Sequence, residues 1–428
     1  MSRQLFGNAR IYTPVDEGRP RAGKAQNELA HWPQGALLVE NGLIVALGDE
    51  REVLAMVSPA EKLAGVDCGG RCLVPGFVDP HTHMCFAELR EAEFALRLTG
   101  TPYLEILRQG GGILSSVRSL AAAGEDELYE KTLRRVATAL RFGTTTLEIK
   151  SGYGLDTANE LKMLRVIDRV AKEGLADVVA TFLGAHAVPP AYRDNPGGFI
   201  DMVIGEMLPA VRRQGVARFC DVFCEEGVFS VTDSRRLLAA AKRMGFGVKL
   251  HADEVHDLGG AGLAAELAAV SADHLLAASE ANLGAMAEAG TIAILLPATA
   301  YSLRKPYAKA RTMIDRGLAV ALATDCNPGS SFTESMPFVI GLAVLNMQLT
   351  PAEALTGATL NSAYGIGMAD RVGSLDKGKQ ADFLLLDGET PAILAYHAGV
   401  SSVAAVYKKG RKIEIGHSKQ GTLVKEKR

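Results

Sequence analysis

The sequence predicts an α/β protein: a (β/α)8 TIM barrel inserted in a small β-sandwich domain that the N- and C-terminal segments build together. Two observations lead to this prediction. In the middle of the chain, apolar strand-like runs alternate with helical stretches, which favours a parallel sheet covered by helices. At both ends the chain contains mostly short strand-like runs separated by turns. We therefore expect residues 1–74 and 379–428 to form the β domain and residues 75–378 to form the barrel.

Length and composition fit this architecture. The chain has 428 residues, which is enough for a barrel of about 250 residues and an attached domain. Its 48% hydrophobic and 22% charged residues are typical of a soluble globular protein. The formal net charge of −3 gives no indication of nucleic-acid or membrane-surface binding. One or two local cationic groups would therefore have to attract an anionic substrate.

The sequence also bears on location. No apolar stretch approaches the roughly 18 uncharged residues that a membrane span requires, and the first residues lack the apolar region of a secretory signal. The six cysteines contain no CxxC pair, so we expect reduced thiols and a cytoplasmic protein.

The terminal segments contain hairpin patterns. Residues 36–48, ALLVENGLIVALG, are two β-rich runs around Asn41-Gly42, the strongest short hairpin signal. Residues 381–388 and 403–415 are again short strand-like runs, and the second contains a glycine turn. These segments are expected to pair in one sheet.

The middle of the chain contains eight apolar runs, the number that a TIM barrel requires. They are CLVPGFVD (72–79), TTTLEIKS (144–151), VVATFLGA (178–185), FCDVFCEE (219–226), GVKLHADE (247–254), SADHLL (271–276), TIAILLPA (291–298) and AVALATD (319–325). Helical stretches such as ELYEKTLRRVATALRFG and ANELKMLRVIDRVAKEG separate them. The competing doubly wound sheet usually carries a glycine fingerprint after its first strand, and none is present.

Reactive side chains gather where these runs end, which is where TIM barrels place their active sites. His81 and His83 follow the first run, and side chains two apart on a strand point the same way. The later runs end at or near further polar residues: Lys150 with Tyr153, His186, Glu225, His251 with Glu254, His274, and Asp325 with Asn327. An isolated HxH is more often a pair of turn histidines, but scattered histidines would not gather in this order.

The pattern predicts a site for one divalent metal, with His81, His83, His251 and Asp325 as ligands. Imidazole and carboxylate ligands suit zinc or iron, and a catalytic site keeps a position open for water. Taken alone, His251 would be a core histidine and Asp325 a helix N-cap.

A general base or proton shuttle is then needed beside the metal. Glu254 and His274 are the candidates, and Asp325 could share the proton. Either His186 or His274 is expected to polarise a substrate carbonyl as a hydrogen-bond donor, and the sequence does not choose between them.

Several stretches carry a family resemblance. HTH after an apolar strand, a later histidine and an aspartate closing the eighth strand resemble the amidohydrolase superfamily. The stretches FVDPHTHMCFAELREAEF, LEIKSGYGLDTANELKMLRV, FLGAHAVP, DVFCEEGVFS, KLHADE, SADHL and ATDCNPGSS resemble, more narrowly, the imidazolonepropionase family over nearly the whole chain. That family hydrolyses the ring amide of 4-imidazolone-5-propanoate to N-formimidoyl-L-glutamate in L-histidine degradation.

The resemblance implies roles residue by residue. It gives the same four metal ligands and one metal per chain, and suggests a homodimer. The substrate contacts that it implies are Arg90, Tyr153, His186, Glu254, Asn327, Gly329 and Ser330. Arg90 would offer a guanidinium fork to the propanoate carboxylate, and the loop from 327 to 331 would turn backbone N–H groups and Ser330 toward an anion.

Some residues leave the assignment open. Lys150 invites comparison with amidohydrolases that bridge two metals through a carboxylated lysine, but we expect a structural or electrostatic role for it. Glu88, Leu120 and Ala121 depart from the family's customary residues and bear on substrate preference. The alternatives are a related amidohydrolase or deaminase that acts on another small cyclic amide or amidine, and a barrel that has lost catalysis and serves as a binding protein.

Overall fold

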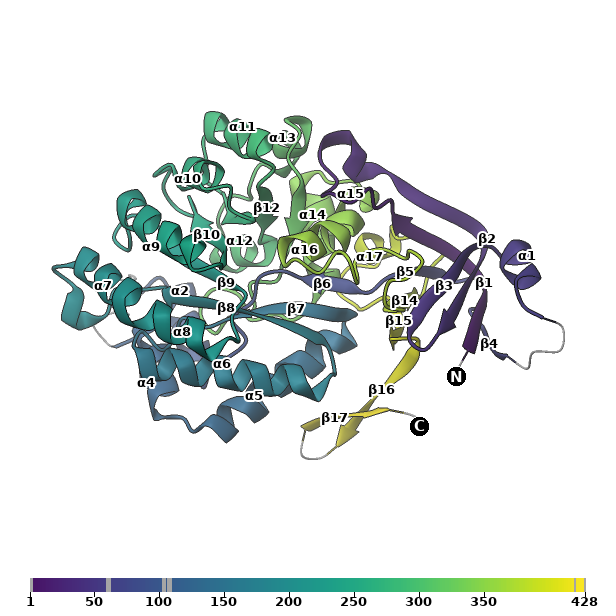
Figure 1. Cartoon of the computed structure of the whole chain (residues 1–428), viewed down its shortest axis with the longest axis horizontal. Coiled ribbons are helices and arrows are strands. Elements are labelled where there is room, and N and C mark those ends of the chain that lie inside the picture. Colours follow the sequence, from purple (N-terminus) through teal and green to yellow (C-terminus); the bar gives the residue numbers. More distant parts are fainter. Residues whose placement is uncertain (1–2, 59–62, 102–104, 106–109, 419–420, 427–428) are drawn as a thin grey trace.

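The protein contains two β-sheets with helices around one of them (Figure 1). The computed structural model describes residues 3–58, 63–101, 105, 110–418 and 421–426. Among these residues no helix is both long enough and apolar enough to span a bilayer.

Eight parallel strands form the barrel, in the order in which they occur along the chain. They are β6 (Phe77–Asp79), β7 (Thr144–Lys150), β8 (Asp177–Ala185), β9 (Phe219–Cys224), β10 (Gly247–Ala252), β11 (Ser271–His274), β12 (Ile292–Leu295) and β13 (Val320–Leu322). Each predicted run contains one of these strands, so the barrel prediction is confirmed.

Helices lie between the barrel strands and after the last of them, and they cover the outside of the barrel (Figure 1). They are α2 (Glu91–Leu98), α4 (Ile113–Ala122), α5 (Glu125–Arg141), α6 (Thr157–Glu173), α7 (Pro196–Met202), a π-helix (Val203–Met207), α8 (Leu208–Gln214), α9 (Val231–Arg243), α10 (Gly260–Glu266), α11 (Glu280–Ala289), α12 (Pro297–Leu303), α13 (Ala310–Asp315), α14 (Met336–Met347), α15 (Pro351–Gly357) and α16 (Leu360–Gly365). The two helical stretches expected from the sequence are α5 and α6. Helix α6 begins after Asp156, whose side chain accepts from the backbone N–H of Asn159, and ends at Gly174 with φ 72°.

Strands from both ends of the chain form the second sheet, on the right of Figure 1. They are β1 (Arg3–Pro14), β2 (Leu29–Glu40), β3 (Leu43–Asp49), β4 (Ala64–Asp67), β5 (Cys72–Pro75), β14 (Phe383–Leu386), β15 (Val403–Lys408), β16 (Arg411–Ser418) and β17 (Gly421–Glu426). Strand β5 joins the two ends, because it pairs parallel with β1 and antiparallel with β14. Asn41 and Gly42 both have positive φ, 52° and 82°, as the predicted hairpin turn requires. The short elements of this part are α1 (Glu50–Ala55), α17 (Ile393–Tyr396) and a 3-10 turn (Gly23–Asn27).

The run 72–79, expected as a single barrel strand, is divided between the two sheets. Residues 72–75 are β5 of the terminal sheet and residues 77–79 are β6 of the barrel. Gly76 lies at the division, and a Cβ there would be 2.3 Å from Oγ1 of Thr145. The chain turns from one sheet into the other where only glycine fits. The domain boundaries at 74/75 and 378/379 stay a prediction.

Candidate active site

The barrel closes through the residues expected to bind metal. Beyond the ends of β6 and β13, Thr82 and Cys326 form a parallel bridge. The N–H of Asp325 donates to the carbonyl oxygen of His81 at 3.1 Å, and the N–H of His83 donates to that of Cys326 at 2.9 Å. The hydrogen bonds that close the barrel therefore fix the backbones of three of the four predicted ligands.

Four potential ligand atoms converge at this closure. Nε2 of His83 lies 3.2 Å from Nε2 of His81 and 3.4 Å from Nε2 of His251. Oδ1 of Asp325 lies 3.5 Å from Nε2 of both His81 and His83. Ligands placed tetrahedrally about 2.0–2.1 Å from an ion are about 3.3–3.4 Å apart. These four distances fit ligands of one such ion.

The protonation state of His81 and His83 also fits a metal. Burial lowers the pKa of His81 and of His83 well below its usual range, so both imidazoles are neutral, as ligation requires. Nδ1 of His81 lies 2.5 Å from Oδ2 of Asp273, and Nδ1 of His251 lies 3.0 Å from Oδ2 of Asp221. Each carboxylate favours the tautomer that keeps hydrogen on Nδ1 and leaves the lone pair on Nε2.

Lys150 lies behind these carboxylates. Its Nζ is 2.8 Å from Asp221 Oδ2, 2.8 Å from Glu148 Oε2 and 3.6 Å from Asp273 Oδ2. The surrounding carboxylates raise the pKa of Lys150 above its usual value although burial opposes this. Lysine carboxylation needs the neutral amine, so these contacts match the electrostatic role that we expected.

The backbone is strained where the strands end. Asp253, His274 and Asp325 have φ of 51°, 75° and 53°, in the left-handed region that side chains rarely adopt. Each residue follows or ends a barrel strand. Such strain is concentrated at functional sites, where the surrounding fold holds it in place.

Glu254 and His274 face each other beside the predicted ligands. Oε1 of Glu254 lies 3.7 Å from Nδ1 of His274, and the Glu254 side chain is 18% exposed. Burial, together with the nearby Asp325, raises the pKa of Glu254 to about 7. Burial lowers the pKa of His274 well below its usual value, so this imidazole is neutral. A carboxyl group with such a pKa can both accept and release a proton at neutral pH.

His186 lies over His83, with ring centroids 4.9 Å apart and planes at 13°. Its Nδ1 is 3.1 Å from the carbonyl oxygen of Gly152, which can only accept, so Nδ1 carries the hydrogen. Burial lowers the pKa of His186 to about 3, so Nε2 has a lone pair at neutral pH. A neutral His186 accepts rather than donates toward the site, unlike the donor role that we considered for it. The ring of Tyr153 lies 5.4 Å from that of His186.

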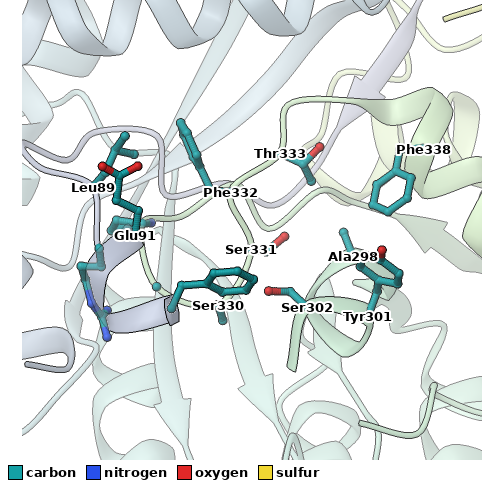
Figure 2. Close-up of a pocket in the computed structure, with 14 residues that line it drawn as sticks. Leu89, Glu91, Ala298, Tyr301, Ser302, Ser330, Ser331, Phe332, Thr333 and Phe338 are labelled. Atoms are coloured by element: carbon teal, nitrogen blue, oxygen red, sulfur yellow. The ribbon is translucent and has the colours of Figure 1, made fainter. Parts of the chain in front are cut away.

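A cavity of 330 Å³ at the barrel mouth brings together three of the expected substrate contacts. Arg90, Gly329 and Ser330 line it together with an apolar wall. Figure 2 shows three aromatic side chains of that wall, Tyr301, Phe332 and Phe338. Glu88 is exposed and lines a separate surface depression, while Leu120 is buried in α4 and Ala121 is exposed.

The loop from 327 to 331 is held by its own asparagine. Oδ1 of Asn327 accepts from the backbone N–H groups of Gly329 and Ser330, at 2.8 and 2.7 Å. Its Nδ2 donates to the carbonyl oxygen of Asp325 at 2.7 Å. The loop N–H groups expected to face an anion are therefore already occupied, and the asparagine holds the loop on Asp325, one of the predicted ligands.

The sequence interpretation missed four side chains that support the site: Glu93, Asp221, Asp273 and Thr299. Glu93 binds Arg90, and the hydroxyl of Thr299 donates to Oδ2 of Asp325 at 2.6 Å. A signal for the two aspartates was present, since both are charged residues inside apolar strands. Lys249 gives a similar signal, because it lies two residues before His251 and side chains two apart on a strand point to the same face.

Known proteins are similar to this chain in sequence and in fold. The model of the amidohydrolase family matches residues 72–413. The imidazolonepropionase of Desulfotalea psychrophila is 72% identical over 96% of this chain and 100% of its own length, and that of Syntrophobacter fumaroxidans is 64% identical over 95% and 96%. An adenosine deaminase from Xanthomonas campestris with bound zinc has the same fold, with a TM-score of 0.69 at 21% identity over 96% of this chain and 92% of that one. The chain thus belongs to the amidohydrolase family and, within it, to the imidazolonepropionases.

Proposed function

We propose that this protein hydrolyses the ring amide bond of 4-imidazolone-5-propanoate to N-formimidoyl-L-glutamate, in the degradation of L-histidine. The names and the high identity of its relatives support this reaction. The observation that carries a hydrolytic mechanism is the convergence of three histidine nitrogens and one aspartate oxygen at the barrel closure.

One divalent ion, zinc or iron, is proposed to occupy this convergence, with His81, His83, His251 and Asp325 as ligands. When bound, such an ion lowers the pKa of a coordinated water to about 7 and polarises a carbonyl group. The neutral imidazoles of His81 and His83 and the spacing of the donor atoms support this assignment.

Glu254 is proposed as the general base. Its raised pKa, about 7, suits a carboxylate that takes a proton from the attacking water and returns it to the departing ring nitrogen. His274 is then the histidine that donates an N–H to the developing negative charge on oxygen, because His186 already uses its N–H on Gly152. Asp325 could share the proton with Glu254, as the sequence suggested.

The substrate is proposed to lie between the ligands and the cavity at Arg90. Arg90 would bind the propanoate carboxylate, with Gly329 and Ser330 beside it. His186, with a free lone pair on Nε2, would accept from a ring N–H, and Tyr153 would pack against the ring. Asn327 would act by holding the loop in place.

The first experiment is an assay of 4-imidazolone-5-propanoate disappearance by purified protein, beside a chelator-treated sample. Fast loss that the chelator abolishes and that zinc or iron restores is the expected result. No loss in metal-replete protein would favour another small cyclic amide or amidine as the substrate. Undetectable metal together with no loss would favour the catalytically inactive barrel. The homodimer and the cytoplasmic location remain proposals, and light scattering of the purified protein checks the first.

A further inference from the structure

A network of buried charges lies beneath the metal-binding residues. Glu148, Lys150, Asp221, Lys249 and Asp273 are all 0% exposed. Removing a charge from water costs several kcal/mol per ion, and mutual attraction offsets that cost only when the geometry is good. Apolar residues fill most barrel interiors, so these charged side chains call for an explanation.

Lys150 lies at the centre of this network. Its Nζ contacts carboxylate oxygens of Asp221 and Glu148 at 2.8 Å each, and that of Asp273 lies 3.6 Å away. Lys249 has a different position, because its Nζ contacts Glu148 at 2.9 Å and the carbonyl oxygen of Pro80 at 3.0 Å. Lys150 therefore joins two aspartates that come from different strands.

Each of these aspartates faces one predicted metal ligand. Oδ2 of Asp221 lies 3.0 Å from Nδ1 of His251, and Oδ2 of Asp273 lies 2.5 Å from Nδ1 of His81. The same two oxygens lie 2.8 and 3.6 Å from Nζ of Lys150. One ammonium group thus restrains the partners of two histidines that approach the site from β10 and from the end of β6.

We propose that Lys150 is a positioning residue of the metal site. It acts through Asp221 and Asp273, which fix the ring orientation and tautomer of His251 and His81 so that both Nε2 atoms face the ion. The inference rests on the proposed function only for the presence of a divalent ion in this site, and it requires no particular substrate.

Lys249 offers a matched control for this proposal. Both lysines are fully buried, and both bind Glu148 at nearly the same distance. A purely structural role would make Lys150→Met and Lys249→Met alike: each removes one buried ammonium and destabilises the barrel. A positioning role predicts that only Lys150→Met changes the metal site.

The experiment measures three properties of the native protein and both variants. Thermal unfolding of the metal-free proteins reports the structural cost. Competition with a chromophoric chelator gives the zinc dissociation constant. The visible absorption of the cobalt(II) form reports the coordination geometry. We expect both variants to unfold at lower temperature, but only Lys150→Met to bind zinc about 10–100 times more weakly and to shift the cobalt bands. Lys150→Arg, which keeps the charge, should recover part of the lost affinity.

A Lys150→Met protein with zinc affinity within threefold of native and unchanged cobalt bands would overturn the proposal. Equal losses of zinc affinity in the two lysine variants would overturn it as well. If Lys150→Met gives no folded protein, Asp221→Asn tests the same link, because it separates Lys150 from His251 and leaves the ammonium paired with Glu148. Native zinc affinity in Asp221→Asn would then refute the proposed route. These readouts need no substrate, so a failed hydrolysis assay leaves them interpretable.

Discussion

The carboxylate of Glu93 accepts hydrogen bonds from both Nε and Nη2 of Arg90. Glu93 also accepts from the backbone N–H of Gly112 at 2.8 Å, so the arginine is fixed between two loops. The remaining terminal nitrogen, Nη1, is turned toward Gly329, where an added Cβ would lie 2.4 Å from it. The guanidinium is thus prepared to bind an anion with only one of its edges.

Gly329→Ala should displace the edge of the Arg90 guanidinium that contains Nη1. We expect KM for the propanoate substrate to rise at least tenfold, because the new methyl group pushes Nη1 away, while zinc content and unfolding temperature stay near native. Steady-state kinetics measure this effect. Gly284→Ala is the control, since a Cβ there meets nothing within 4 Å. An unchanged KM in Gly329→Ala would show that Arg90 does not bind the substrate.

Arg90→Ala should weaken transition-state binding of the anionic substrate by about 2–5 kcal/mol, because a buried carboxylate loses its charge partner. A neutral amidine or nucleobase gains nothing from Arg90, so its kcat/KM should be nearly unchanged. The variant also leaves Glu93 without its arginine. The double variant Arg90→Ala/Glu93→Gln should therefore recover stability but not activity. Full hydrolytic activity in either variant would favour a neutral substrate.

The pKa of Glu254 predicts the acid limb of the pH profile. A base with a pKa of about 7 is lost as pH falls through 7, so kcat/KM should rise with pH across this region and level off above it. Glu254→Gln should abolish this limb along with most of the activity. A profile that is flat from pH 6 to 8 would assign the proton transfer to another group.

The same burial predicts an effect of Glu254 on stability. Its pKa is raised from 4.5 to about 7, so the folded state disfavours the ionised form, and this cost is present above pH 7 and absent below pH 4.5. Glu254→Gln should therefore raise the free energy of unfolding of the metal-free protein at pH 8 by on the order of 2 kcal/mol. At pH 4.5 the two proteins should unfold alike. Chemical denaturation at the two pH values measures the difference.

His274→Ala should retain the metal and lose activity. The four predicted ligands remain, but the donor for the developing oxyanion is removed, which typically costs about 10²–10³ in kcat. Metal analysis and single-turnover kinetics separate the two effects. Near-normal turnover would remove His274 from the mechanism, whereas lost metal would make it a ligand.

Much of the candidate site could be predicted from the residues at the ends of the barrel strands. In a parallel barrel all strands end at one rim, so the order of His81, His251 and Asp325 along the chain was enough to predict that they meet. The carboxylates that face these histidines, such as that of Asp221, lie inside the strands. From the local sequence, an aspartate that points into the barrel cannot be told from one that ends a strand. Only the tertiary structure shows which histidine each one faces.

Other misses have local causes. The run 72–79 is apolar throughout, so its periodicity could not reveal that Gly76 divides it between two sheets. The N–H groups of Gly329 and Ser330 were assigned to an anion because the sequence does not tell which acceptor a loop will choose. The contact between Arg90 and Glu93, three residues apart at the start of a helix, was readable from spacing alone.

The pairing of β5 with β14 has a consequence for synthesis on the ribosome. Residues 72–75 emerge early, but their partner at 383–386 follows roughly 300 residues later, which takes about 15–60 s at typical elongation rates. Throughout that interval one edge of β5 has no partner strand in the nascent chain. An unpaired edge of this kind can join another chain, so aggregation during expression should depend on how quickly the residues between the two strands are translated.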